Sequence, residues 1–263
     1  MTLLEVRDIG KRYVSGGRAV TALDGVSLSV SAGETLGLAG ASGSGKSTLA
    51  RVLTRLVPAD EGTVLFDGED WLALSGGQLR RRRAKMQMVF QDVLGAFNPR
   101  ATVASVLEDP LRIHGIVPRA ERGREVAALL DRVGLPASYA TRSIRDVSGG
   151  QRQRIAIARA IASRPSLIVL DEAVSALDVS LREKILELLV ALQAERGIAY
   201  LFISHDLAVL AAVSHRIAIM DAGRIVETGP AADVVGAPQS PAARALVRAV
   251  PRLVIKQEDR HAV

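Results

Sequence analysis

Three glycine-rich strings in this sequence contain residue types that could hold phosphate groups. The first, GASGSGKST, spans Gly40–Thr48 and fits the pattern G-x-x-x-x-G-K-[ST]. The other two are nearly identical to each other: LSGGQ at Leu74–Gln78 and VSGGQ at Val147–Gln151. The sequence around each string has to decide which of them contacts a nucleotide.

The first string lies in the setting that phosphate binding requires. The preceding segment, ETLGLAG, is a short apolar strand candidate, and the following segment, STLARVLTRLV, has helical spacing and stops at Pro58. A chance glycine-rich turn is the alternative, and it would require neither neighbour. Glycines let backbone N–H groups point at phosphate oxygens, and a helix N-terminus adds favourable partial charge. We therefore expect ATP phosphates to contact Gly40, Ala41, Ser42, Gly43, Ser44, Gly45, Lys46, Ser47 and Thr48.

A pair of acids could complete the chemistry of this string. Lys46 would bring positive charge to the β- and γ-phosphates, and Ser47 would place its hydroxyl on Mg²⁺. The later run LIVLDE, Leu167–Glu172, is typical of a buried parallel strand that ends in two carboxylates. Asp171 could reach the same Mg²⁺, and Glu172 could orient and deprotonate the attacking water. Acids at strand ends are common, so this pair indicates a nucleotide site only in combination with the first string.

Two further polar residues follow apolar strand candidates. Gln91 comes after MQMVF, and His205 comes after YLFIS. A single histidine at a strand end is usually structural, but His205 follows the acid pair by one strand–helix–strand unit. Because the ends of parallel strands converge at one edge of a sheet, we expect Gln91 and His205 near the γ-phosphate.

Composition narrows the class of protein. The 263 residues, 48% of them hydrophobic, can bury a sizeable core. The sequence has no run of about 18 uncharged apolar residues and no secretory pattern at its start, so we expect neither a membrane span nor a leader. The absence of cysteine excludes disulfides and Cys-ligated zinc or iron–sulfur clusters, and it favours a reducing compartment.

The charge balance is basic. A net charge of +6 and a pI of about 10.1 favour polyanionic partners. The densest run is Arg80–Arg83, for which a solvated helix face is the simpler interpretation. Aromatic residues make up 3% of the chain and none interleaves with that run, which argues against a stacking surface for single-stranded nucleic acid.

These motifs, in this order, resemble those of the ABC ATPases, the nucleotide-binding subunits of ABC transporters. The resemblance covers the chain from Leu4 to about Pro251. The resemblance implies an α/β fold: a P-loop NTPase core of the ABC type, with a mixed sheet flanked by helices and an inserted α-helical subdomain. It assigns adenine stacking to Tyr13 and a D-loop to Ser175–Asp178. It assigns catalysis to Glu172, His205 and Gln91. It assigns Mg²⁺ binding to Ser47, Gln91 and Asp171.

The resemblance also separates the two SGGQ strings. The family's signature lies after the Q-loop residue Gln91 and one helix ahead of the acid strand, where only VSGGQ stands. Its residues are expected to face the γ-phosphate bound to a partner subunit, so that ATP lies between two subunits and drives their closure. These residues are Ser148, Gly149, Gly150 and Gln151. In LSGGQ, which precedes Gln91, we expect Ser75 to cap a helix that continues QLRRRRAK.

The same resemblance divides the chain. Residues 1–90 and 151–233 are expected to form the ATPase core with an N-terminal β subdomain. Residues 91–150 are expected to form the inserted helical subdomain, with the signature at its end and EVAALLDRVGL as an amphipathic helix. Residues 234–263 would form a C-terminal extension.

Two local features narrow the subfamily. Asn98–Arg100, NPR, resembles importers of oligopeptides, dipeptides and nickel. Ser240–Pro251 resembles the C-terminal stretch of that group, with Ala242 and Ala243 in place of Tyr and Thr. Some ATPases of the group carry a cysteine-bound iron–sulfur cluster, and this chain resembles the type without one.

The expected function is to bind and hydrolyse ATP and thereby power an ABC importer for short peptides or nickel. The expected partners are two transmembrane permease subunits and a sister ATPase subunit, with a homodimer as the alternative. A periplasmic or extracellular solute-binding protein would act indirectly, and we expect no nucleic acid. The subunit would lie peripherally on the cytoplasmic face of the inner membrane. Two alternatives stay open: a soluble ABC ATPase that acts on nucleic acid, and an exporter ATPase.

Overall fold

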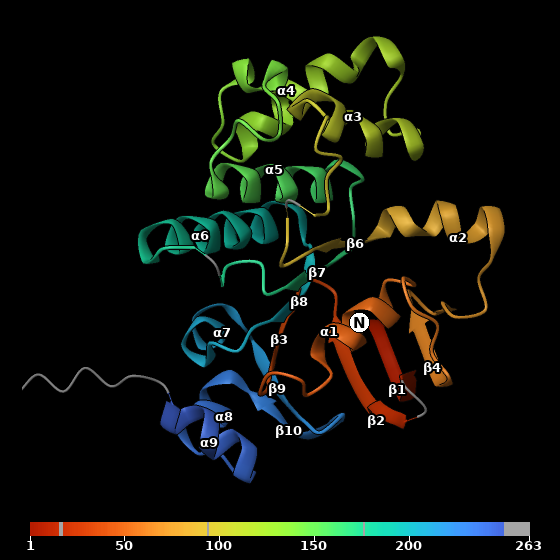
Figure 1. Cartoon of the computed structure of the whole chain (residues 1–263), viewed down its shortest axis with the longest axis vertical. Helices are drawn as coiled ribbons and strands as arrows, with labels where there is room; N and C mark the ends of the chain where they lie inside the picture. Colours follow the sequence, from red (N-terminus) through yellow and green to blue (C-terminus); the bar gives the residue numbers. More distant parts are fainter. Residues whose placement is uncertain (16–17, 94, 176, 250–263) are drawn as a thin grey trace, which may run out of the picture.

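The structure, a computed structural model, describes residues 1–15, 18–93, 95–175 and 177–249, which form two sheets and the helices around them (Figure 1). The strands are β1 (Thr2–Ser15), β2 (Arg18–Ser31), β3 (Thr35–Ala39), β4 (Glu61–Phe66), β5 (Glu69–Asp70), β6 (Met86–Val89), β7 (Leu167–Asp171), β8 (Ala199–Ile203), β9 (Arg216–Asp221) and β10 (Arg224–Pro230). The α-helices are α1 (Lys46–Leu53), α2 (Gly76–Arg82), α3 (Val103–Ile113), α4 (Arg122–Arg132), α5 (Gly149–Ala162), α6 (Val179–Arg196), α7 (Leu207–Val213), α8 (Ala231–Gly236) and α9 (Pro241–Ala249). Short 3₁₀ helices are η1 (Arg83–Lys85), η2 (Arg119–Glu121) and η3 (Ala137–Thr141).

The larger sheet positions the candidate site residues, which follow its strands. Its six strands lie in the order β10-β9-β3-β8-β7-β6. Strands β9, β3, β8, β7 and β6 pair in parallel, and β10 is antiparallel to β9. The C-terminal ends of β3, β8, β7 and β6 therefore meet at one edge of the sheet, in that order. This arrangement confirms the predicted α/β class with a mixed sheet.

The smaller sheet is antiparallel and has the order β2-β1-β4-β5. It shares one hydrophobic core with one face of the larger sheet and with α1. Trp71 anchors this core, because its buried indole Nε1 donates a hydrogen bond of 2.7 Å to the carbonyl oxygen of Leu53 at the end of α1. The helix α1, which follows the glycine-rich segment, thus packs into a core that both sheets share.

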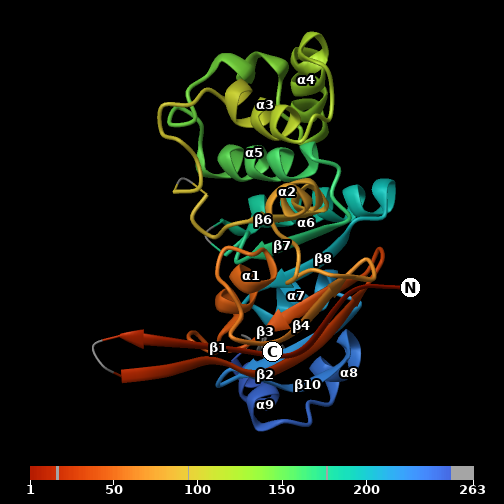
Figure 2. The same ribbon diagram turned by 90° about the vertical axis from the view of Figure 1, so that its right-hand side faces the viewer.

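A second hydrophobic core covers the opposite face of the larger sheet. Successive residues of β7 point into the two cores: Leu167 and Val169 into the first, Ile168 and Leu170 into the second. The second core continues through α6 and α5 into α3 and α4, which lie farthest from the smaller sheet in both views (Figures 1 and 2). Buried residues Val126, Leu129 and Leu130 confirm that EVAALLDRVGL forms an amphipathic helix, α4.

Two local expectations differ from the structure. The helix after the first glycine string ends at Leu53 rather than reaching Pro58, since Arg55 adopts a left-handed φ of 58° that no α-helix accommodates. Ser75 does stand at the N-cap position of α2, but its side chain makes no capping hydrogen bond. The arginine run that follows ends α2 and enters η1.

Candidate functional site

The segment between β3 and α1 has the backbone shape of a phosphate-binding loop. Gly43 and Gly45 have φ angles of 81° and 109°, which side-chain-bearing residues rarely adopt. A Cβ atom at Gly40 would overlap the carbonyl oxygen of Met220, so only glycine allows this close approach. The loop leads directly into the N-terminus of α1, where unpaired N–H groups favour an anion. The backbone shape of Gly40–Thr48 therefore suits the phosphate binding that the sequence predicts.

Lys46 lies inside this loop. It is 7% exposed, and its Nζ donates hydrogen bonds of 2.8 Å to the carbonyl oxygens of Gly40 and Ala41. Burial lowers the pKa of Lys46, and the nearby carboxylates of Glu172 and Asp171 oppose that effect. The ammonium group is thus held beside the two acids, where it can exchange the loop carbonyls for phosphate oxygens.

Ser47 and Asp171, two of the predicted Mg²⁺ ligands, are in direct contact. The hydroxyl of Ser47 donates a hydrogen bond of 3.0 Å to Asp171 Oδ1. Burial raises the pKa of Asp171, and this hydrogen bond opposes the rise. Gln91, the third predicted ligand, lines the same open cleft of about 570 Å³ as Ser47 and Asp171.

This donor set fits Mg²⁺. One carboxylate, one hydroxyl and one amide oxygen are the hard oxygen ligands that Mg²⁺ takes, and it usually leaves its other positions to water and substrate phosphates. In the ranges that the structure describes, no group of three or more His, Cys, Asp and Glu side chains could hold a metal ion. The cleft therefore suits a metal that is shared with a phosphate ligand rather than one caged by protein alone.

Glu172 is held in place by its backbone and by two side chains. Its φ of 52° is unusual for a residue other than glycine, and its amide donates a hydrogen bond of 3.0 Å to the carbonyl oxygen of Ile203 in β8. The hydroxyl of Ser175 donates to the carboxylate, and His205 Nδ1 lies 2.8 Å and 3.0 Å from its two oxygens. The side chain of Glu172 is 11% exposed and that of His205 is 59% exposed. The arrangement suits a carboxylate that acts as a base from a fixed position.

The strand order places the remaining site residues along one edge. Gln91 follows β6 and is exposed, while His205 follows β8 between the phosphate loop and the acid strand. Tyr13 lies apart from this edge, in the hairpin of β1 and β2, with 38% of its surface exposed. Its ring centroid is 5.6 Å from the Nζ atom of Lys11, and its exposed ring is suited to stacking.

The two SGGQ strings differ in structure as well as in position. Ser148 is the N-cap of α5, and its Oγ accepts a hydrogen bond of 3.3 Å from the amide of Gln151, whose Oε1 accepts one of 2.9 Å from the amide of Ser148. This reciprocal capping box fixes the second string. A Cβ atom at Gly150 would overlap Leu181 of α6, so this glycine allows α5 and α6 to approach closely. In the first string, Ser75 makes no capping hydrogen bond, and a Cβ atom at Gly77 would meet no other atom within 4 Å.

One site contact lay outside what the sequence motifs assigned. Ser175 belongs to the predicted D-loop, but nothing in the sequence indicated that its hydroxyl would contact Glu172. The contact depends on the turn after β7, where the amide of Ser175 donates to the carbonyl oxygen of Glu172 at 3.2 Å. Ala176, also part of the predicted D-loop, lies outside the described residues, as do Pro251 and the rest of residues 250–263.

Comparison with known proteins agrees with this geometry. A family model described as ABC transporter matches residues 23–175. The glutathione import ATP-binding protein GsiA of Escherichia coli (strain K12) is 50% identical over 234 residues, which is 89% of this chain and 38% of that protein. The chain therefore spans well under half the length of this curated relative.

Solved structures match over most of the chain. A dimeric, post-hydrolysis structure of the ATP-binding cassette MJ0796 with ADP and phosphate has a TM-score of 0.79 and 31% identity, and the match covers 87% of this chain and 98% of that one. The structure of cbiO1 from Clostridium perfringens, part of the ABC transporter complex cbiONQ, has a TM-score of 0.78 and 26% identity, with 90% and 91% of the two chains covered.

Proposed function

This chain belongs to the ABC transporter family of ATP-binding proteins, and from that membership we propose that it hydrolyses ATP to power an importer of short peptides. The observation that carries the proposal is the edge of the larger sheet, where the phosphate loop, the Ser47–Asp171 pair and the Glu172–His205 pair lie together. The name of the 50% identical relative supports peptide cargo over nickel, because glutathione is itself a short peptide.

The phosphates of ATP would bind in the Gly40–Thr48 loop, with Lys46 as their main cationic partner and Tyr13 beside the adenine. The N-terminus of α1 and the loop N–H groups stabilise the negative charge without moving during the reaction. Ser47, Asp171 and Gln91 would hold Mg²⁺, which when bound neutralises charge on the β- and γ-phosphates. The contact of Ser47 with Asp171, and the cleft that both residues line together with Gln91, support this assignment.

Glu172 would act as the general base. It would accept the proton of a water molecule directed at the γ-phosphate, and it directly follows β7, near enough to Lys46 for their charges to interact. His205 and Ser175 both contact this carboxylate, and the exposed imidazole of His205 would also contact the γ-phosphate. In phosphoryl transfer, positioning and charge stabilisation do most of the work, so rigid support of one carboxylate matters.

Hydrolysis would require two subunits. Ser148, Gly149, Gly150 and Gln151 start α5 on a different element from the phosphate loop, and we propose that they contact the γ-phosphate bound to a partner subunit. Ser148 and Gly149 are exposed at the capped start of α5, and a helix N-terminus favours an anion, which suits this role. The dimeric state of MJ0796 supports the arrangement. The partner would be a sister ATPase, with a second copy of this chain as the alternative.

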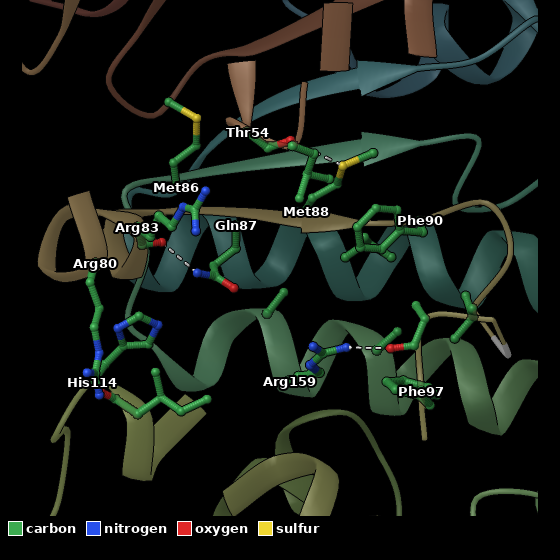
Figure 3. Close-up of a pocket in the computed structure, with 17 residues that line it drawn as sticks. Thr54, Arg80, Arg83, Met86, Gln87, Met88, Phe90, Phe97, His114 and Arg159 are labelled. Carbon is green, nitrogen blue, oxygen red and sulfur yellow. Dashed lines mark hydrogen bonds between the residues drawn. The ribbon is translucent and has the colours of Figure 1, made fainter. Parts of the chain in front are cut away.

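A groove beside Gln91 would receive a permease. This groove, here called the Phe90 groove, has a volume of about 420 Å³ and lies between β6 and helices α3 and α5 (Figure 3). Arg80 and His114 line one end, and Phe97 and Arg159 line the other (Figure 3). Its apolar floor and cationic rim suit a short amphipathic segment with an acidic residue.

The proposed location follows from these partners. No helix among the described residues is long and apolar enough to cross a membrane. As the ATPase subunit of an importer, the chain would reach its two transmembrane permeases from outside the bilayer, at the cytoplasmic face of the inner membrane. A solute-binding protein would deliver cargo to the opposite face.

The test is phosphate release by the purified chain with ATP and Mg²⁺, followed by peptide uptake in proteoliposomes. The proteoliposomes contain the permeases and the solute-binding protein that neighbouring genes encode. ATP-dependent uptake of short peptides supports the proposal. Hydrolysis that DNA or RNA strongly stimulates at physiological salt would favour the nucleic-acid alternative instead. ATP-dependent extrusion without uptake would favour an exporter.

A further inference from the structure

We propose that Arg182, in the first turn of α6, is a positioning residue that holds the His205 loop against the Glu172–Asp178 loop in the geometry that hydrolysis requires. The inference rests on the proposed ATPase function, since it concerns the support of the same site. It assigns a role to a charged side chain that no sequence motif includes.

The guanidinium of Arg182 joins two loops that follow different strands. Its Nη1 donates a hydrogen bond of 2.9 Å to Asp206 Oδ2, in the loop after β8. Its Nη2 donates one of 3.4 Å to the carbonyl oxygen of Leu177, in the loop after β7. Because a guanidinium is planar and rigid, a single side chain fixes the separation of these two acceptors.

Asp206 transmits this restraint to His205. It follows His205 directly in the chain, and its Oδ1 accepts hydrogen bonds of 3.0 Å and 3.3 Å from the amides of Ala208 and Val209, which caps α7. Its own amide donates to Ser204 Oγ at 3.0 Å. Both carboxylate oxygens of Asp206 are therefore used, one by the helix and one by Arg182. His205, the preceding residue, has little freedom beside them.

The two loops are thus joined at two points. The first is the contact between Glu172 and His205, which contains the reactive groups themselves. The second is the ion pair of Arg182 and Asp206. A small cavity of about 20 Å³ lies between these points, lined by Ser175, Arg182, Ser204, His205 and Asp206 among others. With the second point removed, the His205 loop would be free to rotate about the first, and the imidazole would no longer be fixed toward the γ-phosphate.

The same helical turn also reaches the second SGGQ string. Leu181, the neighbour of Arg182, packs against the backbone of Gly150 closely enough to exclude any side chain there. The first turn of α6 therefore contacts the signature string through Leu181 and the two catalytic loops through Arg182. A shift of the signature on the docking of a partner's phosphate would move this turn, and with it the Arg182–Asp206 pair.

The solvent exposure of the Arg182–Asp206 ion pair favours a positioning role over a role in stabilising the fold. The side chains of Arg182 and Asp206 are 25% and 35% exposed, and ion pairs this accessible to water contribute little to global stability. The Nε atom of Arg182 is buried and makes no hydrogen bond with the described residues, so the side chain is not placed for maximal stabilisation. Removal of Arg182 should therefore disturb geometry more than folding.

The experiment compares Arg182→Met with Arg196→Met in the full chain. Arg196 ends the same helix, has a similar exposure of 23% and forms an ion pair with Glu195, so it controls for loss of one arginine from α6. We expect Arg182→Met to lower kcat for ATP about 10- to 100-fold, the range that misplacement of a catalytic group produces. KM for ATP and the melting temperature should stay close to those of Arg196→Met. Arg182→Lys should restore part of the rate. Asp206→Asn keeps the α7 cap and should lower kcat as much as Arg182→Met does. The double variant Arg182→Met/Asp206→Asn should be no slower than either single variant.

A second measurement does not depend on turnover. The sequence has four histidines, so the ring resonance of His205 can be assigned in NMR spectra by its loss in His205→Ala. It should shift in Arg182→Met and stay in place in Arg196→Met. An unshifted resonance, or a kcat equal to that of Arg196→Met, would overturn the positioning role while the ATPase assignment stands. A parallel fall in kcat, nucleotide affinity and melting temperature would assign Arg182 to stability alone. A wild-type chain without ATPase activity, both alone and together with the sister ATPase, contradicts the proposed function, and the NMR comparison still decides the inference.

Discussion

The two SGGQ strings give a sharp test of the site, because pattern matching alone confuses them. We consider the matched substitutions Ser148→Asp and Ser75→Asp. Aspartate is as good an N-cap as serine, so Ser148→Asp keeps the cap of α5 that Ser148 now supplies to Gln151. At Ser75 the side chain makes no capping hydrogen bond, so little stability is at stake. Both variants should therefore fold and bind nucleotide as monomers.

The expected difference lies in dimer closure. If Ser148 faces the partner's γ-phosphate, its replacement by aspartate places a negative charge near another. At about 6 Å and an effective dielectric constant of about 20, one such pair of unit charges costs about 3 kcal/mol, which corresponds to an affinity loss of about 100-fold. The same charge at Ser75 meets no phosphate, so Ser75→Asp should close and hydrolyse ATP normally.

The assay combines ATP-dependent dimerisation by analytical ultracentrifugation with steady-state ATPase rates and melting temperatures. Ser148→Asp should lose dimerisation and turnover while its melting temperature stays near that of wild type. The reverse pattern, loss of activity in Ser75→Asp and normal activity in Ser148→Asp, would refute our choice of signature and the domain plan built on it.

Three further outcomes follow from the structure. Lys46→Ala should weaken nucleotide binding sharply, since it removes the full positive charge inside the phosphate loop; unchanged binding in a fluorescent-nucleotide titration would exclude that role. Asp60→Asn should lower the melting temperature at pH 7. The hydrogen bonds from Lys11 and from the amide of Arg12 hold the pKa of Asp60 below its ordinary value. The stability that the Asp60 carboxylate contributes to the folded protein is therefore present above the unfolded carboxyl pKa of about 3.9, and it is lost as pH falls through the lowered folded value. Thermal scans of both proteins should therefore converge in acid, and a constant difference would contradict the linkage. In filter-binding assays, DNA or RNA should bind only weakly, with affinity that falls steeply with salt. In phosphate-release assays, neither nucleic acid should stimulate ATPase activity.

Much of the site could be predicted because its chemistry is local in sequence. The Gly40–Thr48 string, the acids at the end of LIVLDE and the single residues Gln91 and His205 each follow a strand, and parallel strands bring their ends to one edge. The direct contacts of Ser47 with Asp171 and of Glu172 with His205 are consistent with that reasoning. The individual roles of these residues, and the division into residues 1–90, 91–150, 151–233 and 234–263, remain predictions.

What the sequence did not predict depends on backbone detail and long-range contact. The short α1 follows from the left-handed φ of Arg55, which residue type does not indicate, since arginine rarely adopts it. The missing cap at Ser75 depends on the loop geometry before α2. The Arg182–Asp206 pair joins residues 24 positions apart through the fold of β7, α6 and β8, and no local pattern marks either partner.

Glu172→Gln tests the central claim most directly. The amide keeps the size and shape of the side chain and one acceptor oxygen toward Ser175 and His205, and it removes basicity and charge. We predict that the purified variant binds ATP normally and accumulates as an ATP-bound dimer. Its phosphate-release rate should fall about 10²- to 10⁴-fold, the usual cost of losing a general base. Near-normal phosphate release by Glu172→Gln would contradict the account, because hydrolysis at the edge of the larger sheet would then proceed without the base that the site places there.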